Sequence, residues 1–538
     1  MNRSRVRDAT AGLVAAAIAL GVGELVAALT GGKSPAVAVG DVIVDYTPGP
    51  VVKAAIEALG TRDKPALLLA VTLGSLAVGA LLGPAAGRRR GIGTVAFAGV
   101  GALGLIAIAR DPLTGTLIAI VIAAATAAAG WVALRTLLDA ATAGNATPEA
   151  QMPGRGIAGR RRFLAFASGG AGAAAFTAFA GRRLIGPVVD VEAQRAEITL
   201  PPVAGGVTPT AVAGGGGAAS SAVADAPATA TGDLGIEGLS PLVTPNADFY
   251  RIDTALVVPR VDASTWRLHV TGMVDRPFDI GYDELLAMTA IEQSVTLACV
   301  SNEVGGDLAG NAYWRGVPLA ALLERAGVQA GATQIVGRSV DDFTVGFPTD
   351  VALDGRASMV AVGMNGEPLP ARHGFPARLV VPGLYGYVSA TKWLAEIELT
   401  TLEAFDAYWI PRGWAKQAPI KTQSRIDVPR EGRSIAAGRV AIAGVAWGGI
   451  RGVGRVEVNV RPKDQAEAGE WREATIGPAL STSSWRQWVL EWDAAPGDYR
   501  IEVRATDGEG MTQSAERRPP APDGATGYHS ITARVLNG

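Results

Sequence analysis

Long apolar runs separated by short charged segments occupy the first third of the chain. Crossing the hydrocarbon core of a membrane takes about 20 mostly apolar residues in a helix. Four runs meet that length: Ala11–Leu29, Pro65–Gly83, Ile92–Ala109 and Leu113–Leu134. A fifth run, Phe163–Ala180, is shorter and diluted by glycine. The pattern therefore predicts a transmembrane domain of five helices over residues 1–186.

Arginine clusters between these runs predict the orientation of the membrane domain. They precede the first run, separate the second from the third, and precede the fifth, at Arg3, Arg5 and Arg7, at Arg88–Arg90, and at Arg155 and Arg160–Arg162. Loops rich in Lys and Arg stay in the cytoplasm. With five crossings, this rule predicts a cytoplasmic N-terminus in the cytoplasmic membrane and extracytoplasmic domains after residue 185.

A tether and two further domains are expected after the membrane part. Residues 187–245 are rich in Ala, Gly, Pro and Thr and nearly free of aromatic residues, which favours a flexible linker. Residues 246–430 mix strand and helix patterns: Trp266–Val270 alternates as a strand, and Val317–Ala326 has helical spacing before Gly327. Their fold class is α+β.

Residues 431–538 show only strand patterns, separated by turns rich in Gly, Pro and Asp. The expected strands are Arg455–Val460, Trp485–Trp492, Tyr499–Ala505 and Ser530–Val535. About a hundred residues of this kind fit an all-β, immunoglobulin-like sandwich of two sheets.

Composition excludes several classes of function. With 48 Lys+Arg against 50 Asp+Glu and 18% charged residues, the chain lacks the basic surface that a nucleic-acid partner requires. A single cysteine, Cys299, rules out an intrachain disulfide and any zinc site built on two or four cysteines. The three histidines all lie at or after His269.

Cys299 closes an apolar strand pattern and opens a polar, glycine-rich loop that runs to Gly306. A thiolate at such a strand end can ligate a metal or attack a substrate. A lone cysteine is also commonly an inert buried residue, and a cysteine protease would need a histidine base. Soft ligation of a redox metal is a further reading of the same pattern.

The start of the fifth apolar run carries an export pattern. Arg160 and Arg161 are followed by Arg162, Phe163 and Leu164, and then by a weakly hydrophobic Gly/Ala-rich stretch. This order resembles a twin-arginine signal, which exports folded proteins. An ordinary cytoplasmic arginine cluster before a helix is the alternative reading.

Several ordered motifs resemble the sulfite oxidase family of molybdopterin-dependent oxidoreductases. They are Leu297–Gly306, Gly310–Leu319, Met364–Gly383 and Thr391–Leu394 in the α+β part, followed by Gly444–Gly449 and Arg455–Val458 in the sandwich. The resemblance covers about 290 residues. It implies a molybdopterin domain followed by the family's dimerisation domain, and therefore a homodimer.

The resemblance also implies roles for individual residues. Cys299 matches the cysteine that ligates molybdenum, which makes it the catalytic and metal-binding residue, with one molybdenum–molybdopterin per chain. The cofactor-binding residues that it implies are Tyr250, Arg251, Ser301, Asn302, His373, Arg378, Thr391 and Lys392. Charge-assisted bonds from Arg and Lys to phosphate oxygens fit this assignment.

Departures from the family pattern bear on the substrate. Sulfite oxidases carry arginines after the ligand cysteine and before the Lys-Trp pair, whereas Val300–Gly306 and Gly386–Thr391 contain none. Phe343 stands where we expect the family's active-site tyrosine. Each lost charged hydrogen bond costs about 1.5–3 kcal/mol, so sulfite is disfavoured as the substrate. A methionine-sulfoxide-like reductase and a non-enzymatic, membrane-tethered surface module are the alternatives.

The sequence predicts that the electrons pass to a separate carrier. Residues 1–190 contain no histidine or cysteine, and no Cys-x-x-Cys-His motif occurs in the chain, so neither haem nor an iron–sulfur cluster is expected. A cytochrome or a quinone-linked protein is the expected partner, beside a small-molecule substrate.

Overall fold

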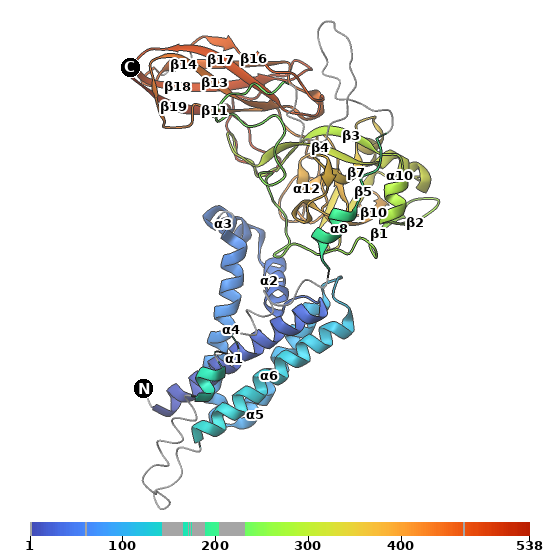
Figure 1. The fold of residues 1–538 in the computed structure, drawn as a ribbon, viewed down its shortest axis with the longest axis vertical. Coiled ribbons are helices and arrows are strands. Elements are labelled where there is room, and N and C mark those ends of the chain that lie inside the picture. Colours follow the sequence, from blue (N-terminus) through green and yellow to red (C-terminus); the bar gives the residue numbers. More distant parts are fainter. Residues whose placement is uncertain are drawn as a thin grey trace, which may run out of the picture. The chain divides into compact units, whose positions relative to one another are not determined.

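The computed structural model describes residues 3–59, 62–142, 165–170, 172, 174, 189–203, 232–465 and 469–537. The chain divides into two compact units. The first is Met1–Asp190 with Ala255–Val258, and the second is Val191–Thr254 with Pro259–Gly538 (Figure 1).

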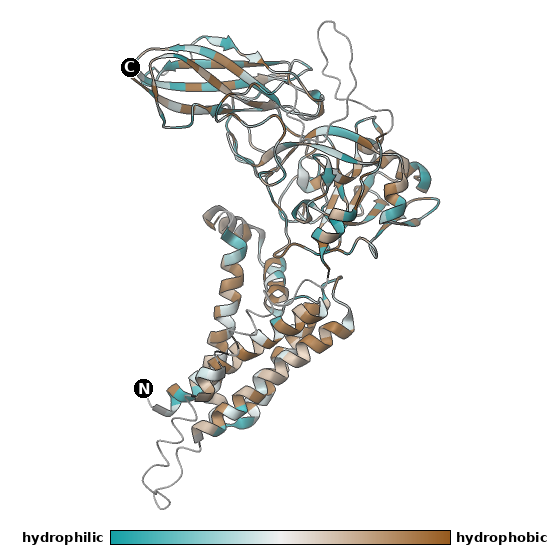
Figure 2. Cartoon of the chain, in the orientation of Figure 1, coloured by the Kyte–Doolittle hydropathy of each residue, from teal (hydrophilic) through white to brown (hydrophobic). Residues whose placement is uncertain are grey.

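The first unit is helical. Its helices are α1 (Arg3–Thr30), α2 (Pro35–Tyr46), α3 (Gly49–Leu59), α4 (Asp63–Arg88), α5 (Arg90–Ala109) and α6 (Thr116–Thr142). Within the described residues, four helices are long and apolar enough to cross a membrane, over Ser4–Thr30, Asp63–Arg88, Arg90–Ala109 and Thr116–Ala141. Figure 2 shows these helices as predominantly hydrophobic. They contain the first three predicted spans and all but the first three residues of the fourth, and they fit a membrane anchor.

Glycine lets α1 and α4 approach closely. A Cβ added to Gly79 would lie 2.6 Å from the Ala16 Cβ, and one added to Gly12 would lie 2.0 Å from the Gly79 carbonyl oxygen. Small residues at such crossings are the usual device for packing helices in lipid. Of the fifth predicted span, only residues 165–170, 172 and 174 are described, and these are helical. The twin-arginine pattern lies outside the described residues.

Two sheets form the α+β part of the second unit. One has the order β2-β1-β10-β5-β6 and the other β3-β4-β7-β8, with β9 paired to β7. The strands are β1 (Arg267–Gly272), β2 (Phe278–Gly281), β3 (Ile291–Ala298), β4 (Ala309–Pro318), β5 (Gln334–Ser339), β6 (Thr344–Pro348), β7 (Met359–Met364), β8 (Glu367–Pro368), β9 (Arg378–Val380) and β10 (Leu394–Thr400). The helices are α8 (Val191–Glu197), α9 (Tyr282–Ala287), α10 (Leu319–Ala326), α11 (Thr349–Leu353), α12 (Gly386–Ser389) and the 3-10 turn η3 (Ala371–His373).

The local predictions for this part are confirmed. The strand expected at Trp266–Val270 is β1, and the strand expected to lead into Cys299 is β3. The predicted helix before Gly327 is α10, and Gly327 ends it with a left-handed φ of +69°. α10 buries Leu319, Leu322, Leu323 and Ala326, as helical spacing requires.

The C-terminal part consists of two packed sheets. Their strand orders are β11-β13-β17-β16 and β12-β19-β18-β14-β15. The elements are β11 (Gln423–Val428), β12 (Ser434–Ala436), β13 (Gly438–Trp447), η4 (Gly449–Arg451), β14 (Arg455–Pro462), β15 (Trp471–Glu473), β16 (Thr475–Ile476), β17 (Arg486–Ala494), β18 (Gly497–Thr506) and β19 (His529–Leu536). All four predicted strands are present. Ile442, Val458, Trp488 and Ile501 belong to the buried core of this sandwich.

The segments beside the two predicted domain boundaries make specific contacts. β11 lies within residues 246–430 but pairs with β13, so it belongs to the sandwich. In the predicted linker, the Leu234 N–H donates to the Gln487 side chain at 2.9 Å. The Asn311 amide donates to the Leu242 carbonyl at 2.9 Å. The end of the linker, residues 232–245, therefore packs on the sandwich and on the α+β part.

Candidate functional site

Cys299 follows directly after β3, at the start of a closed loop. Its backbone N–H donates to the Leu308 carbonyl at 2.9 Å, and its own carbonyl accepts the Asn302 N–H at 3.0 Å. The Asn302 side chain, 5% exposed, accepts the Leu308 N–H at 2.8 Å. Cys299 itself is 8% exposed. These bonds fix the position of a sulfur that is largely shielded from solvent.

The surroundings of Cys299 act on its thiol in opposite directions. Burial raises the pKa of the thiol, whereas hydrogen bonds from the Ser301 backbone and hydroxyl, and the positive charge of Lys392, lower it. Burial is the largest cause, so the protein alone favours the neutral thiol. A bound cation would favour the thiolate, since metal ligation requires the deprotonated sulfur.

His373 presents an unused nitrogen inside the protein. The side chain is fully buried at the end of η3, and Nε2 lies 2.9 Å from the Asn246 carbonyl oxygen. A carbonyl only accepts, so Nε2 carries the proton. Burial lowers the pKa of His373 to about 3, which keeps the ring neutral. Its Nδ1 has no hydrogen-bond partner among the described residues. Nδ1 can therefore accept a bond from a donor on a bound molecule.

Arg378, in β9, is a buried cation whose hydrogen bonds go to carbonyls. It is 3% exposed, Nη1 donates to the His373 carbonyl at 3.1 Å, and the guanidinium stacks 4.8 Å from the Trp314 ring centroid. Burial lowers its pKa to about 10, with partial compensation from Tyr250 and Asp253. A buried charge is stable only when it is well paired, so this site favours an anionic ligand.

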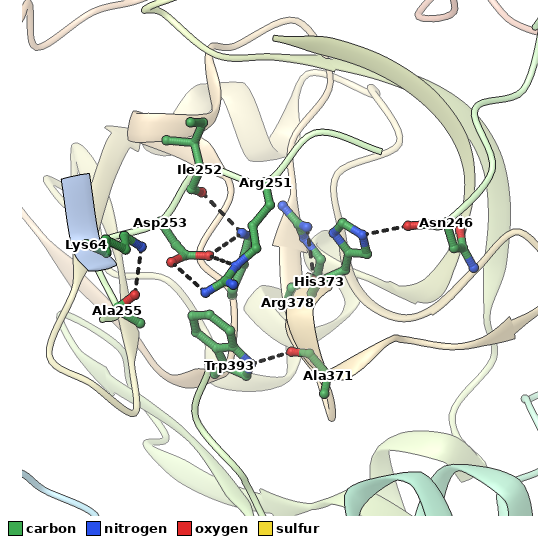
Figure 3. A network of polar contacts seen from close by, with 11 residues as sticks. Lys64, Asn246, Arg251, Ile252, Asp253, Ala255, Ala371, His373, Arg378 and Trp393 are labelled. Atoms are coloured by element: carbon green, nitrogen blue, oxygen red, sulfur yellow. Dashed lines mark hydrogen bonds and ion pairs between the residues drawn. The ribbon is translucent and has the colours of Figure 1, made fainter. Parts of the chain in front are cut away.

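Asp253 joins the other two cations. Lys392 Nζ lies 2.9 Å from Asp253 Oδ2 and also donates to the Ile252 carbonyl at 3.1 Å. Arg251 donates to both Asp253 oxygens, from Nε at 2.8 Å and from Nη2 at 3.2 Å. Burial lowers the pKa of Lys392 to about 8, although Asp253 opposes this shift. Figure 3 shows Arg251 and Asp253 beside Arg378 and His373.

The charges of this cluster suit a phosphate ester. Arg251, Arg378 and Lys392 contribute three positive charges and Asp253 contributes one negative charge, which leaves two positive charges. A phosphate monoester carries roughly −1.5 to −2 at neutral pH. Gly374 (φ +111°) allows the segments to meet, because a Cβ there would lie 3.1 Å from both the Arg378 Cβ and the Lys392 Cα.

The remaining predicted residues have different surroundings. The Tyr250 ring stacks on Phe249 at 5.3 Å, and burial and the nearby Cys299 raise the pKa of its hydroxyl. The Thr391 hydroxyl donates to the Gly337 carbonyl at 3.3 Å. The Asn302 amide closes its own loop. Thr391 and Asn302 therefore have structural partners within the protein, whereas Tyr250 lies near the cysteine.

Sequence reasoning missed three residues that the structure brings to the site. Asn246 orients His373, Asp253 pairs with two of the cations, and Tyr385 lies close enough to Cys299 for the two charges to interact. Asp253 is two positions after Arg251, which is a usable signal. Phe343, in contrast, lies in the β5–β6 turn with its ring 5.6 Å from that of Tyr408.

Within the described residues, no group of three or more His, Cys, Asp or Glu side chains could hold a metal ion. A metal that is carried by its own organic cofactor needs few protein ligands, and a single cysteine beside a cationic cluster would suit it. The unpartnered Nδ1 and the two uncompensated positive charges fit molybdopterin.

Comparison with known proteins identifies the class of this domain. Residues 255–409 match the family model for the oxidoreductase molybdopterin binding domain. Human mitochondrial sulfite oxidase is 30% identical over 308 residues, covering 48% of this chain and 55% of that enzyme. The uncharacterized oxidoreductase YuiH of Bacillus subtilis is 34% identical over 153 residues, covering 28% of this chain and 74% of YuiH.

The solved sulfane dehydrogenase SoxCD of Paracoccus pantotrophus is similar at 22% identity and a TM-score of 0.47, covering 56% of this chain and 85% of that one. The chain spans about half the length of the mammalian sulfite oxidases that it matches. It belongs to the sulfite oxidase family of molybdenum-dependent oxidoreductases.

Proposed function

We propose that this protein is a membrane-anchored, extracytoplasmic enzyme that carries out two-electron oxygen-atom transfer at a molybdenum ligated by Cys299. The observation that carries the proposal is the cluster in which buried His373, whose Nδ1 has no partner among the described residues, lies with three cations that share Asp253. Family membership identifies the ligand that such a pocket takes.

The residues divide into two roles. His373 would accept a hydrogen bond from the pterin, and Arg378, Lys392 and Arg251 would bind its phosphate. Cys299 would supply the thiolate, which the Ser301 N–H and hydroxyl stabilise. The bound molybdenum supplies two-electron redox chemistry with exchange of an oxygen atom. Tyr250 and Tyr385, both with pKa values raised by burial, remain protonated beside it and can donate hydrogen bonds.

A neutral substrate fits this site better than sulfite. The cation that acts on the Cys299 thiol is Lys392, and its charge is balanced by Asp253. The other groups that interact with the sulfur, Tyr250, Tyr385 and Ser301, are uncharged. This observation favours a second candidate function, the reduction of sulfoxide-type substrates.

Metal analysis tests the proposal. Full-length protein from a host that makes molybdopterin is expected to contain about one molybdenum per chain, because the pocket has one cysteine and one phosphate site. The measurement is elemental analysis together with release of the pterin. Protein that folds without molybdenum in such a host would instead support a non-enzymatic, membrane-tethered surface module.

The proposed topology makes a separate prediction. A reporter active only in the cytoplasm is expected to give a signal when fused at residue 140 and none at residue 240, because the arginine clusters stay inside. Equal signals at both positions would contradict the extracytoplasmic location.

Export by the twin-arginine route is proposed from Arg160 and Arg161. Replacing both with Lys keeps the positive charge but removes the motif. The soluble domains should then remain in the cytoplasm. Normal export of that variant would contradict the twin-arginine route. Arg160 and Arg161 would then serve only to keep their segment in the cytoplasm.

We also propose that electrons leave for a separate cytochrome or quinone-linked protein, while the C-terminal part forms an immunoglobulin-like dimer interface. The purified chain should show no haem Soret band, since its membrane part has no histidine or cysteine to ligate iron. Rapid turnover should require an added electron carrier. A stoichiometric haem in the purified chain would contradict this scheme.

A further inference from the structure

The loop after Cys299 is held from the C-terminal sandwich. Arg425, in β11, donates from Nη1 to the Gly306 carbonyl at 2.7 Å. The same guanidinium donates from Nε to Asp427 and from Nη2 to Ser240, also at 2.7 Å each. Because it is fixed on three sides and only 9% exposed, its bond to Gly306 ties the loop to the sandwich.

His529, the first residue of β19, contacts the same loop. A Cβ added to Gly305 would lie 2.2 Å from the His529 Cδ2 and 2.3 Å from its Nε2. Gly305 also has a φ of +82°, so both its backbone conformation and its surroundings require glycine. The His529 Nδ1 accepts the Ile426 N–H at 2.9 Å, which fixes the ring in place.

The strand that leads into Cys299 is bound by the sandwich as well. β3 is at the edge of its sheet. Its Thr296 N–H donates to the Ser483 carbonyl at 3.0 Å, and the Trp485 N–H donates to the Thr296 hydroxyl at 2.7 Å. Contacts from the sandwich therefore hold the chain both before and after the cysteine.

We propose that Arg425 and His529 are positioning residues that hold the Cys299 loop and so set the geometry of its sulfur. The sandwich is then part of the site in addition to any role in assembly. A ligand group displaced by 1 Å is enough to impair a metal site. The role given to the Cys299 sulfur rests on the proposed function. The contacts of Arg425 and His529 with the loop do not depend on a metal.

Thiol labelling tests the contacts directly. Cys299 is the only cysteine, so alkylation of cofactor-free, full-length protein reports how often its loop opens. Arg425→Gln is expected to accelerate maleimide labelling at least about tenfold, because local opening becomes easier. Arg425→Lys keeps a cationic donor group on one nitrogen, so its labelling rate should lie between those of the parental protein and Arg425→Gln.

Arg461→Gln is the matched control. Arg461 is 7% exposed and bonds to Asn459 and Glu502 in the sandwich, and within the described residues it makes no hydrogen bond to the Cys299 loop. Arg461→Gln should lower the thermal midpoint about as much as Arg425→Gln does. Its Cys299 should still be labelled at close to the parental rate. Equal labelling of the Arg425→Gln and parental proteins would overturn the proposed contact.

A second pair of variants covers the case in which Arg425→Gln does not fold. Gly305→Ala should also accelerate labelling, because its methyl group strikes His529. The clash is absent in the double variant Gly305→Ala/His529→Ala. The increase in its labelling rate should therefore be smaller than the product of the increases in the two single variants. Fully multiplicative effects would contradict the Gly305–His529 contact.

The loaded enzyme tests the consequence for the site. Arg425→Gln should shift the sulfur-to-metal absorption and the electron paramagnetic resonance spectrum, and lower kcat more than it changes KM, at unchanged molybdenum content. Faster labelling with an unchanged spectrum and kcat would refute the positioning role. If the parental protein binds no molybdenum, the proposed function fails, while the labelling results still decide whether the contacts exist.

Discussion

A Cys299→Ser variant is expected to fold, to retain its pterin, and to lose turnover by roughly three orders of magnitude or more, as removal of an essential catalytic group does. A serine hydroxyl stays protonated and is a hard ligand, whereas the role proposed for Cys299 would need a soft thiolate. The exchange is nearly isosteric at a position that is 8% exposed. His373, Arg378 and Lys392, the expected pterin contacts, are unchanged.

The measurement is turnover with an artificial electron acceptor or donor, together with molybdenum and pterin content. Glu303→Gln is the control, since Glu303 lies in the same loop with an exposed side chain. It should retain activity. Turnover of Cys299→Ser at the parental rate with full molybdenum content would remove Cys299 from the chemistry.

The second large effect is expected from Arg378→Gln. In the proposed complex Arg378 binds phosphate through two charged hydrogen bonds, and their loss, at about 1.5–3 kcal/mol each, should weaken cofactor binding by roughly 10² to 10⁴. The cofactor-free protein should respond in the opposite direction. Its thermal midpoint should rise, because the variant no longer buries a guanidinium that burial disfavours.

The weaker cofactor binding is measured as pterin content when the cofactor is limiting. The higher thermal midpoint is measured by thermal unfolding of the cofactor-free protein. Arg372→Gln is the matched control, because Arg372 is close in sequence but exposed. A fully loaded Arg378→Gln protein under limiting cofactor would show that phosphate is held elsewhere.

The sequence predicted most of the elements but few of the contacts between them. The four long apolar helices, β3 before Cys299, α10 and the sandwich strands follow from local periodicity, which the amino-acid pattern carries directly. The contacts of His373 with Asn246 and of Lys392 with Asp253 join residues more than a hundred positions apart. Periodicity holds no information on such pairs.

For the candidate site as well, the sequence predicted which residues take part but not the contacts that they make. Motif resemblance assigned His373, Arg378 and Lys392 to one cofactor, and in the structure these three side chains lie close together. It could not tell that the Thr391 hydroxyl bonds to β5 or that Asn302 closes its own loop. Nor could it assign β11 to the sandwich, because strand pairing decides that membership.

The contact between Gly305 and His529 has a consequence for biosynthesis. These residues are roughly two hundred positions apart, and such non-local contacts form late in folding. While the ribosome is still making the C-terminal strands, the cysteine loop lacks its contact with His529. We would therefore expect the proposed cofactor to be inserted most easily before residue 529 has been synthesised and docked. On the proposed twin-arginine route, which exports folded proteins, a protein loaded in this way would be complete before it leaves the cytoplasm.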